Sequence, residues 1–286
     1  MLLSKRKTIV ALVLILFASF AQAASCVWRV TGPNGPTLYL GGSVHLLRSS
    51  DYPLPPQFNV AFDASSRLAF EVNPQQMLTF AKEFGKAGEY PKGDSLKNHV
   101  DVRTYAYLRR IFALLHVPEE KFSRYHAWMI AVVLEQVGHS PTEYELGVER
   151  FIQRRALAHH KPMVGLESPR EHAAVFSGLS DVQAEAYLLL HFIPNAANKT
   201  TRDEVLAAWR RGDADFLARA TAAAYRDFPA LAEREVDARN RAWLPKIEGY
   251  LAGGQTYFVV AGAGHMGGPN GLLALLRGRG YRIEQL

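Results

Sequence analysis

The sequence of 286 residues has a single cysteine, Cys26. One cysteine cannot form an internal disulfide, so burial and hydrogen bonding must hold the fold even in an oxidising compartment. Cys26 follows Ala23-Ala24-Ser25, which faintly resembles the motif at which bacterial lipoproteins are modified. Because an aliphatic residue is usual where Ala23 stands, we do not expect lipid anchoring at Cys26.

Long apolar runs are also missing, apart from one near the start. Three basic residues, Lys5 to Lys7, precede an apolar stretch over residues 8–20, and Ala21-Gln22-Ala23 follows it. A basic start, a short apolar core and an Ala-x-Ala exit are typical of a secretory signal peptide. The run is shorter than the roughly 20 residues that span a bilayer. We therefore expect cleavage after Ala23, no transmembrane segment in the mature chain, and a periplasmic or secreted protein.

No segment concentrates charge of one sign. Residues 1–23 hold three of the 33 basic residues and none of the 27 acidic ones, which leaves 30 − 27, a net charge near +3, for the mature chain. Basic and acidic residues alternate throughout, so a nucleic-acid partner is not expected. A Pro/Gly/Ser linker and a fixed-period repeat are also missing, which favours one domain over residues 24–286. The oligomeric state cannot be predicted from these features.

The familiar catalytic signatures are absent too. The sequence has no His-Glu-x-x-His, no Gly-x-Ser-x-Gly, no phosphate-binding Walker loop and no dinucleotide-binding glycine fingerprint. These absences exclude several common hydrolase and nucleotide-binding classes. What remains is a motif that occurs twice, Gly-x-x-His.

Short apolar runs bounded by glycine, proline or asparagine predict β-strands at residues 37–40, 67–72, 161–167, 255–262 and 281–285. Helical spacing dominates residues 74–160 and 168–251, with interruptions near Pro194-Asn195 and Pro229, and a short helix is expected at 271–279. The predicted class is α/β: a central, largely parallel or mixed sheet formed from the N- and C-terminal segments, with a mostly helical middle region. The strand order is not predicted.

Polar residues follow four of these strands. The first strand leaves through Gly42-Ser43-Val44-His45, and the fourth through Gly262-Ala263-Gly264-His265; the second and third strands end at Glu71 and Glu167. In parallel sheets, ligands gather outside the carboxyl ends of the strands. Glycine allows a sharp turn or a close approach as the chain leaves the sheet. We expect Gly42 and Gly262 to play this part and the two histidines to project over one rim.

Two imidazoles and a carboxylate suit a divalent metal ion with open positions for water or substrate. The same groups without a metal could carry out general acid–base chemistry. Glu167 has a structural alternative, because Ser168-Pro169 after it is a typical helix start. The other histidines are interpreted as surface or packing residues: His99, His116, His126, His139, His159, His160, His172 and His191.

The motifs resemble those of the TraB/GumN family, which belongs with the Tiki-type proteins. The resemblance runs in order through LYLGGSVHLL, YPLPPQFNVAFDASSRLAFEVN, KPMVGLES, WRRGD, RNRAW and YFVVAGAGHMGGPNGLLALLRGRGYRI, and so covers nearly all of the mature chain. Tiki-type relatives are metal-dependent proteases with paired Gly-x-x-His motifs and a glutamate. More distant relatives include macrolide esterases and haem-binding proteins.

By resemblance, His45, Glu71 and His265 are the core residues and the metal ligands. Arg239 and Asn240 occupy the family's Arg-Asn pair, which would place a cation and an amide near the site. The cation could orient a carboxylate or stabilise an oxyanion, whereas a surface salt bridge is the structural alternative for Arg239. Glu149 stands where many relatives carry an aspartate after Gly-Val, and whether it and Glu167 belong to the site stays open.

These observations favour an exported metal-dependent hydrolase of peptide or ester bonds that uses manganese, cobalt, zinc or iron. Its substrate would be a peptide or small molecule of the cell envelope. The alternative is a non-catalytic envelope protein that binds a hydrophobic peptide, a haem-like ligand or a glycan. Aromatic residues of the helical middle could then line its cleft: Tyr107, Phe122, Tyr125 and Trp128. A role in polysaccharide export is suggested only by the family's name.

Overall fold

The computed structural model describes residues 24–286 except 34, 138, 191–199 and 227. Within these residues six strands form one sheet in the order β4-β3-β5-β2-β1-β6. The strands are β1 (Val27–Thr31), β2 (Thr37–Ser43), β3 (Arg67–Val72), β4 (Met163–Glu167), β5 (Tyr257–Gly262) and β6 (Arg282–Gln285). The predicted α/β fold, with a sheet built from both ends of the chain and a helical middle, is confirmed.

The four strands predicted to carry site residues are the parallel ones. β5 lies between β2 and β3, and β4 is the outer neighbour of β3. In the register, Ser43 of β2 lies opposite Gly262 of β5, and Val72 of β3 lies opposite Glu167 of β4. All four strands therefore end at the same edge of the sheet, with both Gly-x-x-His motifs on adjacent strands.

The sequence pattern did not predict strand β1. It pairs antiparallel with β2, from Val27 opposite Gly41 to Thr31 opposite Thr37, and β6 pairs antiparallel with its other side. The segment VWRVT is short, and Arg29 interrupts its apolar character just after the predicted cleavage site, which hid the strand. Its ends are nevertheless tied down, because Ser25 N–H donates to the Leu286 carbonyl at 2.7 Å.

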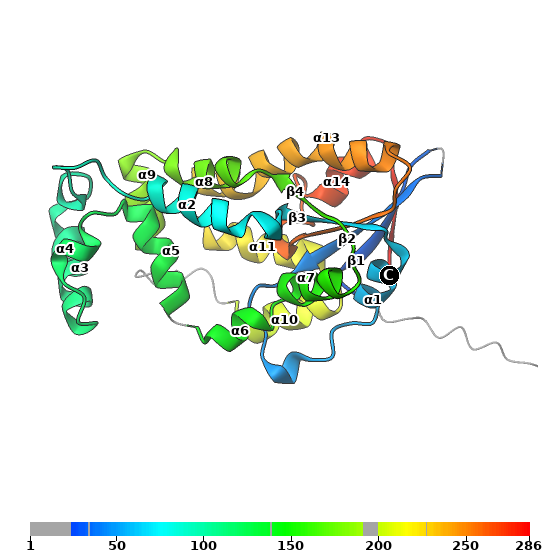
Figure 1. Cartoon of the computed structure of the whole chain (residues 1–286), viewed down its shortest axis with the longest axis horizontal. Helices are drawn as coiled ribbons and strands as arrows, with labels where there is room; N and C mark the ends of the chain where they lie inside the picture. The colour runs from blue at the N-terminus through cyan, green and yellow to red at the C-terminus, as the bar shows by residue number, and fades with distance from the viewer. Residues whose placement is uncertain (1–23, 34, 138, 191–199, 227) are drawn as a thin grey trace, which may run out of the picture.

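Helices cover both faces of the sheet (Figure 1). Phe58 packs against Trp209 and Phe258, which joins two helices to β5 in the sheet core. The helices around the sheet are α1 (Gln57–Ala64), α6 (Pro141–Glu145), α7 (Val148–Ala158), α10 (Arg202–Arg210), α11 (Ala214–Ala224), α12 (Pro229–Ala232), α13 (Ala238–Ala252) and α14 (Leu272–Gly278). Short 3-10 turns are η1 (Ser49–Asp51), η2 (Pro74–Gln76), η3 (Leu96–Asn98) and η5 (Ala263–His265); a π-helical turn, η4 (Glu233–Asp237), precedes α13.

The remaining helices form a second group, here called the helical lobe, with a hydrophobic core of its own. They are α2 (Met77–Ala87), α3 (Val102–Leu114), α4 (Glu119–Phe122), α5 (Ala127–Val137), α8 (Pro169–Ser177) and α9 (Asp181–Leu189). Trp128 lies at its centre, with its ring 5.1 Å from that of Phe84 and 5.8 Å from that of Phe176. α3 and α4 lie farthest from the sheet (Figure 1). The apolar periodicity of this region therefore reports core packing, as predicted.

Some predictions fall outside the described residues: the signal peptide, the interruption at Pro194-Asn195, and His191. In the part of the chain that the structure describes, none of the helices has the length and apolar character needed to cross a membrane. α12 begins at Pro229, in agreement with the predicted interruption there.

Candidate active site at the carboxyl ends of the parallel strands

Glu71, at the end of β3, directly contacts the second Gly-x-x-His motif. The Gly262 N–H donates to Glu71 Oε1 at 2.8 Å, and His265 Nε2 lies 3.9 Å from the same oxygen. Burial alone would raise the pKa of the Glu71 carboxyl, but Arg239 and the two motif histidines hold it well below its ordinary value. Glu71 is therefore an anion pointing into the site.

The motif glycines provide close approach, as predicted. A side-chain carbon at Gly42 would lie 2.5 Å from Cys26 Sγ and 3.2 Å from Ala263 Cα. At Gly262 the same carbon would lie 3.3 Å from Glu71 Oε1 and 3.5 Å from His265 Cδ2. The first glycine therefore brings the two motifs together, and the second leaves room for the carboxylate.

His265 is fixed by Asn240, the next residue after Arg239 on α13. The Asn240 amide donates to the Asn270 carbonyl at 2.9 Å and to the His265 carbonyl at 3.3 Å, so its oxygen faces His265 Nδ1 at 2.8 Å. This arrangement assigns the proton to Nδ1, and the Nε2 lone pair lies 3.4 Å from Arg239 Nη1 and 3.9 Å from Glu71 Oε1. Burial and the nearby Arg239 cation outweigh Glu71 and lower the pKa of His265 to about 4, so the imidazole is neutral.

His45 has a different partner. Its Nδ1 lies 3.1 Å from Glu149 Oε1, and the Ser43 hydroxyl donates to the same oxygen. Its side chain is 67% exposed, against 8% for that of His265. The Glu149 carboxylate raises the pKa of His45. His45 is therefore a charged, accessible imidazole at the rim in the absence of other ligands.

Glu149 reaches His45 because α7 begins against the first motif. The Val148 N–H donates to the Val44 carbonyl at 3.1 Å, and a side-chain carbon at Gly147 would lie only 2.3 Å from the His45 carbonyl oxygen. Only glycine allows this approach, which places Glu149 in the first turn of α7. An anion is favoured there by the helix dipole. The structure thus assigns Glu149 to the site, next to His45.

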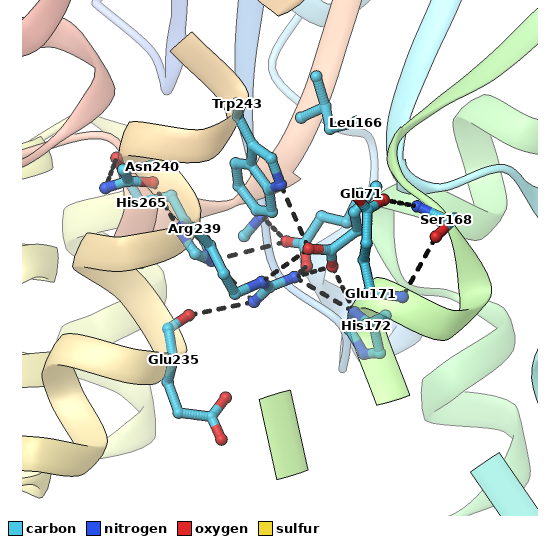
Figure 2. A network of polar contacts seen from close by, with 12 residues as sticks. Glu71, Leu166, Ser168, Glu171, His172, Glu235, Arg239, Asn240, Trp243 and His265 are labelled. Atoms are coloured by element: carbon cyan, nitrogen blue, oxygen red, sulfur yellow. Dashed lines mark hydrogen bonds and ion pairs between the residues drawn. The ribbon is translucent and has the colours of Figure 1, made fainter. Parts of the chain in front are cut away.

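Arg239 is buried and connects two strand ends. Its guanidinium contacts Glu71 Oε2 at 2.5 Å and Glu167 Oε1 at 2.6 Å, and it lies 4.6 Å from the centre of the Trp243 ring (Figure 2). The alternative of a surface salt bridge for Arg239 is therefore wrong. The guanidinium orients the two carboxylates, one of the roles expected for it.

Glu167 joins the site and leads into a helix start at the same time. Ser168 after it caps α8, while the Glu167 carboxylate receives hydrogen bonds from Arg239 and from the Trp243 indole at 3.3 Å. His172 packs against the rings of Phe80 and Phe176, as its interpretation as a packing residue predicted, but it also has a polar partner, because its Nδ1 lies 2.5 Å from Glu167 Oε1. The sequence carried a signal for this contact: His172 follows Glu167 by five residues, in the first turns of the helix that starts at the strand end.

Glu71, Glu167 and His172 offer ligand atoms within 4.8 Å of one another, the spacing of a metal site. However, one nitrogen of Arg239 contacts all three residues, at 2.5, 2.6 and 3.3 Å. A cation already takes this position, so the cluster is better explained as an ion-pair network. The predicted set of His45, Glu71 and His265 is not among the groups of described residues that reach this spacing. Two of its members do lie close together, since Nε2 of His265 is 3.9 Å from Oε1 of Glu71.

A family model described as the TraB/PrgY/gumN family matches residues 26–285. The chain belongs to the TraB/PrgY/gumN family. The matched range includes both Gly-x-x-His motifs, Glu71 and the Arg239-Asn240 pair, so the resemblance noted in the sequence is confirmed. No curated protein and no solved structure matches the chain. The reaction of this TraB/PrgY/gumN member must therefore be argued from its site.

Proposed function

We propose that this chain is a metal-dependent hydrolase of peptide or ester bonds that acts in the cell envelope. The observation that carries the proposal is the meeting of His265 and Glu71, whose Nε2 and Oε1 atoms lie 3.9 Å apart, with the imidazole kept neutral by burial and Arg239 and oriented by Asn240. A neutral imidazole with its other nitrogen hydrogen-bonded is the usual state of a metal-ligating histidine.

The spacing of two donors in the set supports binding of a divalent ion. Two ligands that each lie about 2.0–2.2 Å from one ion are roughly 3–4 Å apart, which is the separation of Nε2 and Oε1 here. His45, on the neighbouring strand, would supply a second imidazole once its proton is displaced. Nitrogen and carboxylate donors are compatible with manganese, cobalt or zinc. When bound, the ion would polarise a carbonyl and activate water.

The chain's own residues would position both the ion and the substrate. Asn240 and Glu149 hold the two imidazoles by their Nδ1 atoms, so the Nε2 atoms are the ones that would bind the ion; at His265 the ion would replace the 3.4 Å contact of Nε2 with Arg239. Arg239 fixes Glu71 and keeps that carboxyl ionised. Because His45 is the exposed member of the set, we place substrate entry on its side of the rim.

A second candidate function is binding of an apolar peptide without turnover. The helical lobe has an apolar groove of about 690 Å³, which Phe112, Phe122, Tyr125 and Met129 help to line. Two of the four aromatic residues expected to line a cleft are thus in it. Trp128 is instead buried in the core of the lobe, and Tyr107 is not among the lining residues.

The deciding experiment is metal analysis of protein that starts at Ala24 and has no histidine tag. Elemental analysis would be done as purified, after chelation, and after loading with manganese, cobalt or zinc, followed by peptide and ester hydrolysis assays. The test variant is His45→Ala/His265→Ala. His139→Ala is the control, because His139 lies away from the strand ends, near Glu143.

We expect near-stoichiometric metal and metal-dependent hydrolysis in the wild type and the control, and neither in the double variant. If the double variant kept full metal content and activity, the assignment of the site would be wrong. If the wild type could not be loaded but still hydrolysed a substrate, metal-free acid–base catalysis would replace it. Retention of an unmodified apolar peptide, with no turnover, would favour the groove as the functional site.

A further inference from the structure

Glu235 is an acidic residue beside the candidate site with no role in the interactions described so far. It lies in the π-helical turn η4, four residues before Arg239. Its backbone carbonyl accepts a hydrogen bond from Arg239 at 3.1 Å, whereas its carboxylate points away from the guanidinium (Figure 2). π-helical turns inside α-helices are frequent at functional sites, and this one places a carboxylate next to the candidate site.

One oxygen of the Glu235 carboxylate, Oε1, lacks a hydrogen-bond partner. This oxygen is buried from solvent, and no described residue donates to it. A buried acceptor without a donor destabilises the folded protein, and such groups usually indicate a missing ligand or a functional task. Neither nearby cation on this helix serves it: the Arg239 guanidinium is bound by Glu71 and Glu167, and Arg234 donates to the carbonyls of Val175 and Ala174.

The surroundings of Glu235 favour a cation over a neutral donor. Burial and the nearby carboxylates of Glu135 and Glu71 raise the pKa of Glu235 to about 7, although Arg239 and Arg234 oppose the rise. Burial and the Glu235 carboxylate also raise the pKa of Tyr187 and Tyr225, so both phenols stay neutral beside it. A bound cation would relieve the repulsion among the carboxylates.

We propose that Glu235 binds a positively charged group of the substrate, an ammonium or a guanidinium, and so selects peptides that carry a cation near the scissile bond. This inference rests on the proposed function and narrows its substrate class. Glu235 is a specificity residue: it holds a remote group of the substrate while Glu71 and the motif histidines face the reacting bond. Binding of such a group gives the unpaired carboxylate oxygen a charge-assisted hydrogen bond.

The first test measures binding alone, in metal-free protein, with hexylammonium as the probe and hexanol as its neutral analogue. The variants are Glu235→Gln, which keeps the shape, and Glu233→Gln as a control on the same turn, since Glu233 is exposed and pairs with Arg241. We expect hexylammonium to raise the melting temperature of the wild type and the control, and to bind Glu235→Gln about ten-fold more weakly. Hexanol should act equally on all three proteins.

The second test measures hydrolysis of matched peptides that contain lysine or norleucine. The wild type should prefer lysine about ten-fold in kcat/KM, mainly through KM, and Glu235→Gln should lose that preference while it keeps its rate on the norleucine peptide. Equal responses of the wild type and Glu235→Gln to hexylammonium would overturn the inference. Glu235-dependent amine binding without hydrolysis of any peptide or ester would instead retain the subsite and overturn the proposed function.

Discussion

The two Gly-x-x-His motifs are alike in sequence and lie on adjacent strands, yet their histidines sit in opposite environments. His265 is buried, hydrogen-bonded to an amide, and neutral, with its pKa lowered to about 4. His45 is exposed and paired with a carboxylate that raises its pKa. The second motif therefore holds a neutral imidazole in a fixed orientation. The first presents a protonated imidazole to solvent.

The difference originates outside the motifs. Asn240 comes from α13 and Glu149 from α7, and each binds the Nδ1 atom of its histidine. Glu149 sets the charge of His45, whereas burial and Arg239 set the charge of His265, and the glycines and strand ends set the places of both imidazoles. Replacing either histidine, or a residue that contacts it, tests this difference.

The largest effect is expected from removing one histidine at a time. His265→Ala should lower metal affinity and kcat by at least about 100-fold, because loss of a ligand exceeds the 10- to 100-fold effect of losing a ligand's partner. His45→Ala should have a comparable effect on kcat. Metal titration and steady-state kinetics measure both. If His45→Ala bound metal as the wild type does, His45 would act only on the substrate, and the asymmetry would be one of role as well as of charge.

Arg239→Met should cost about 3–5 kcal/mol of unfolding free energy, because it leaves two buried carboxylates, Glu71 and Glu167, without their cation. Arg241→Met is the matched control. Its pair with Glu233 is half exposed, so about 0–1 kcal/mol is expected. Urea unfolding at pH 7 compares the two. Equal losses would show that the network around the buried motif contributes no more than a surface pair.

The pH dependence of stability in metal-free protein isolates His265. The unfolded chain takes up a proton near pH 6.5 and the folded chain only near pH 4, so the unfolded state binds more protons between these values. The contribution of His265 is present above pH 6.5 and is lost as the pH falls, by about 3 kcal/mol below pH 4. His265→Asn should remove this loss from unfolding curves measured between pH 7 and 4. An unchanged acid limb would contradict the neutral state assigned to His265.

The smallest effect is expected at Glu149. Glu149→Gln should lower the pKa of His45 toward its ordinary value of about 6.5, which a proton NMR titration of the imidazole can follow. The stabilisation by the pair is present below about pH 6.5 and is lost as the pH rises through the raised pKa of His45, the reverse of the His265 case. Because His45 is exposed, the stability change should stay within about 1 kcal/mol. An unshifted His45 would show that another group sets its charge.

Much of this site could be predicted because its residues end apolar strands. His45, Glu71, Glu167 and His265 stand where the periodicity stops, and parallel strands bring such positions to one edge. His172 could not be predicted in the same way, because its place depends on the direction in which α8 leaves Glu167. The contact between Asn240 and His265 joins positions 25 residues apart and depends on the rotation of α13 about its axis.

Strand β1 is an element that could not be predicted from the sequence. Its five residues gain their strand character from pairing with β2 and β6, and tertiary partners of this kind leave no periodic trace in a short segment. The π-helical turn was also invisible, because its residues, Glu233 to Asp237, have ordinary helical propensities. Structure that depends on tertiary contacts is therefore harder to predict from the sequence than structure that the segment's own residues favour.

The π-helical turn has a consequence for how this site can change. A π turn holds one residue more than an α turn over the same rotation, so the helical segments before and after it keep their relative orientation. A regular helix with one residue fewer between 233 and 237 would therefore still hold Arg239 and Asn240 where they are. The turn adds a residue beside the site without moving the cation or the amide, so the turn and this pair can change independently of each other.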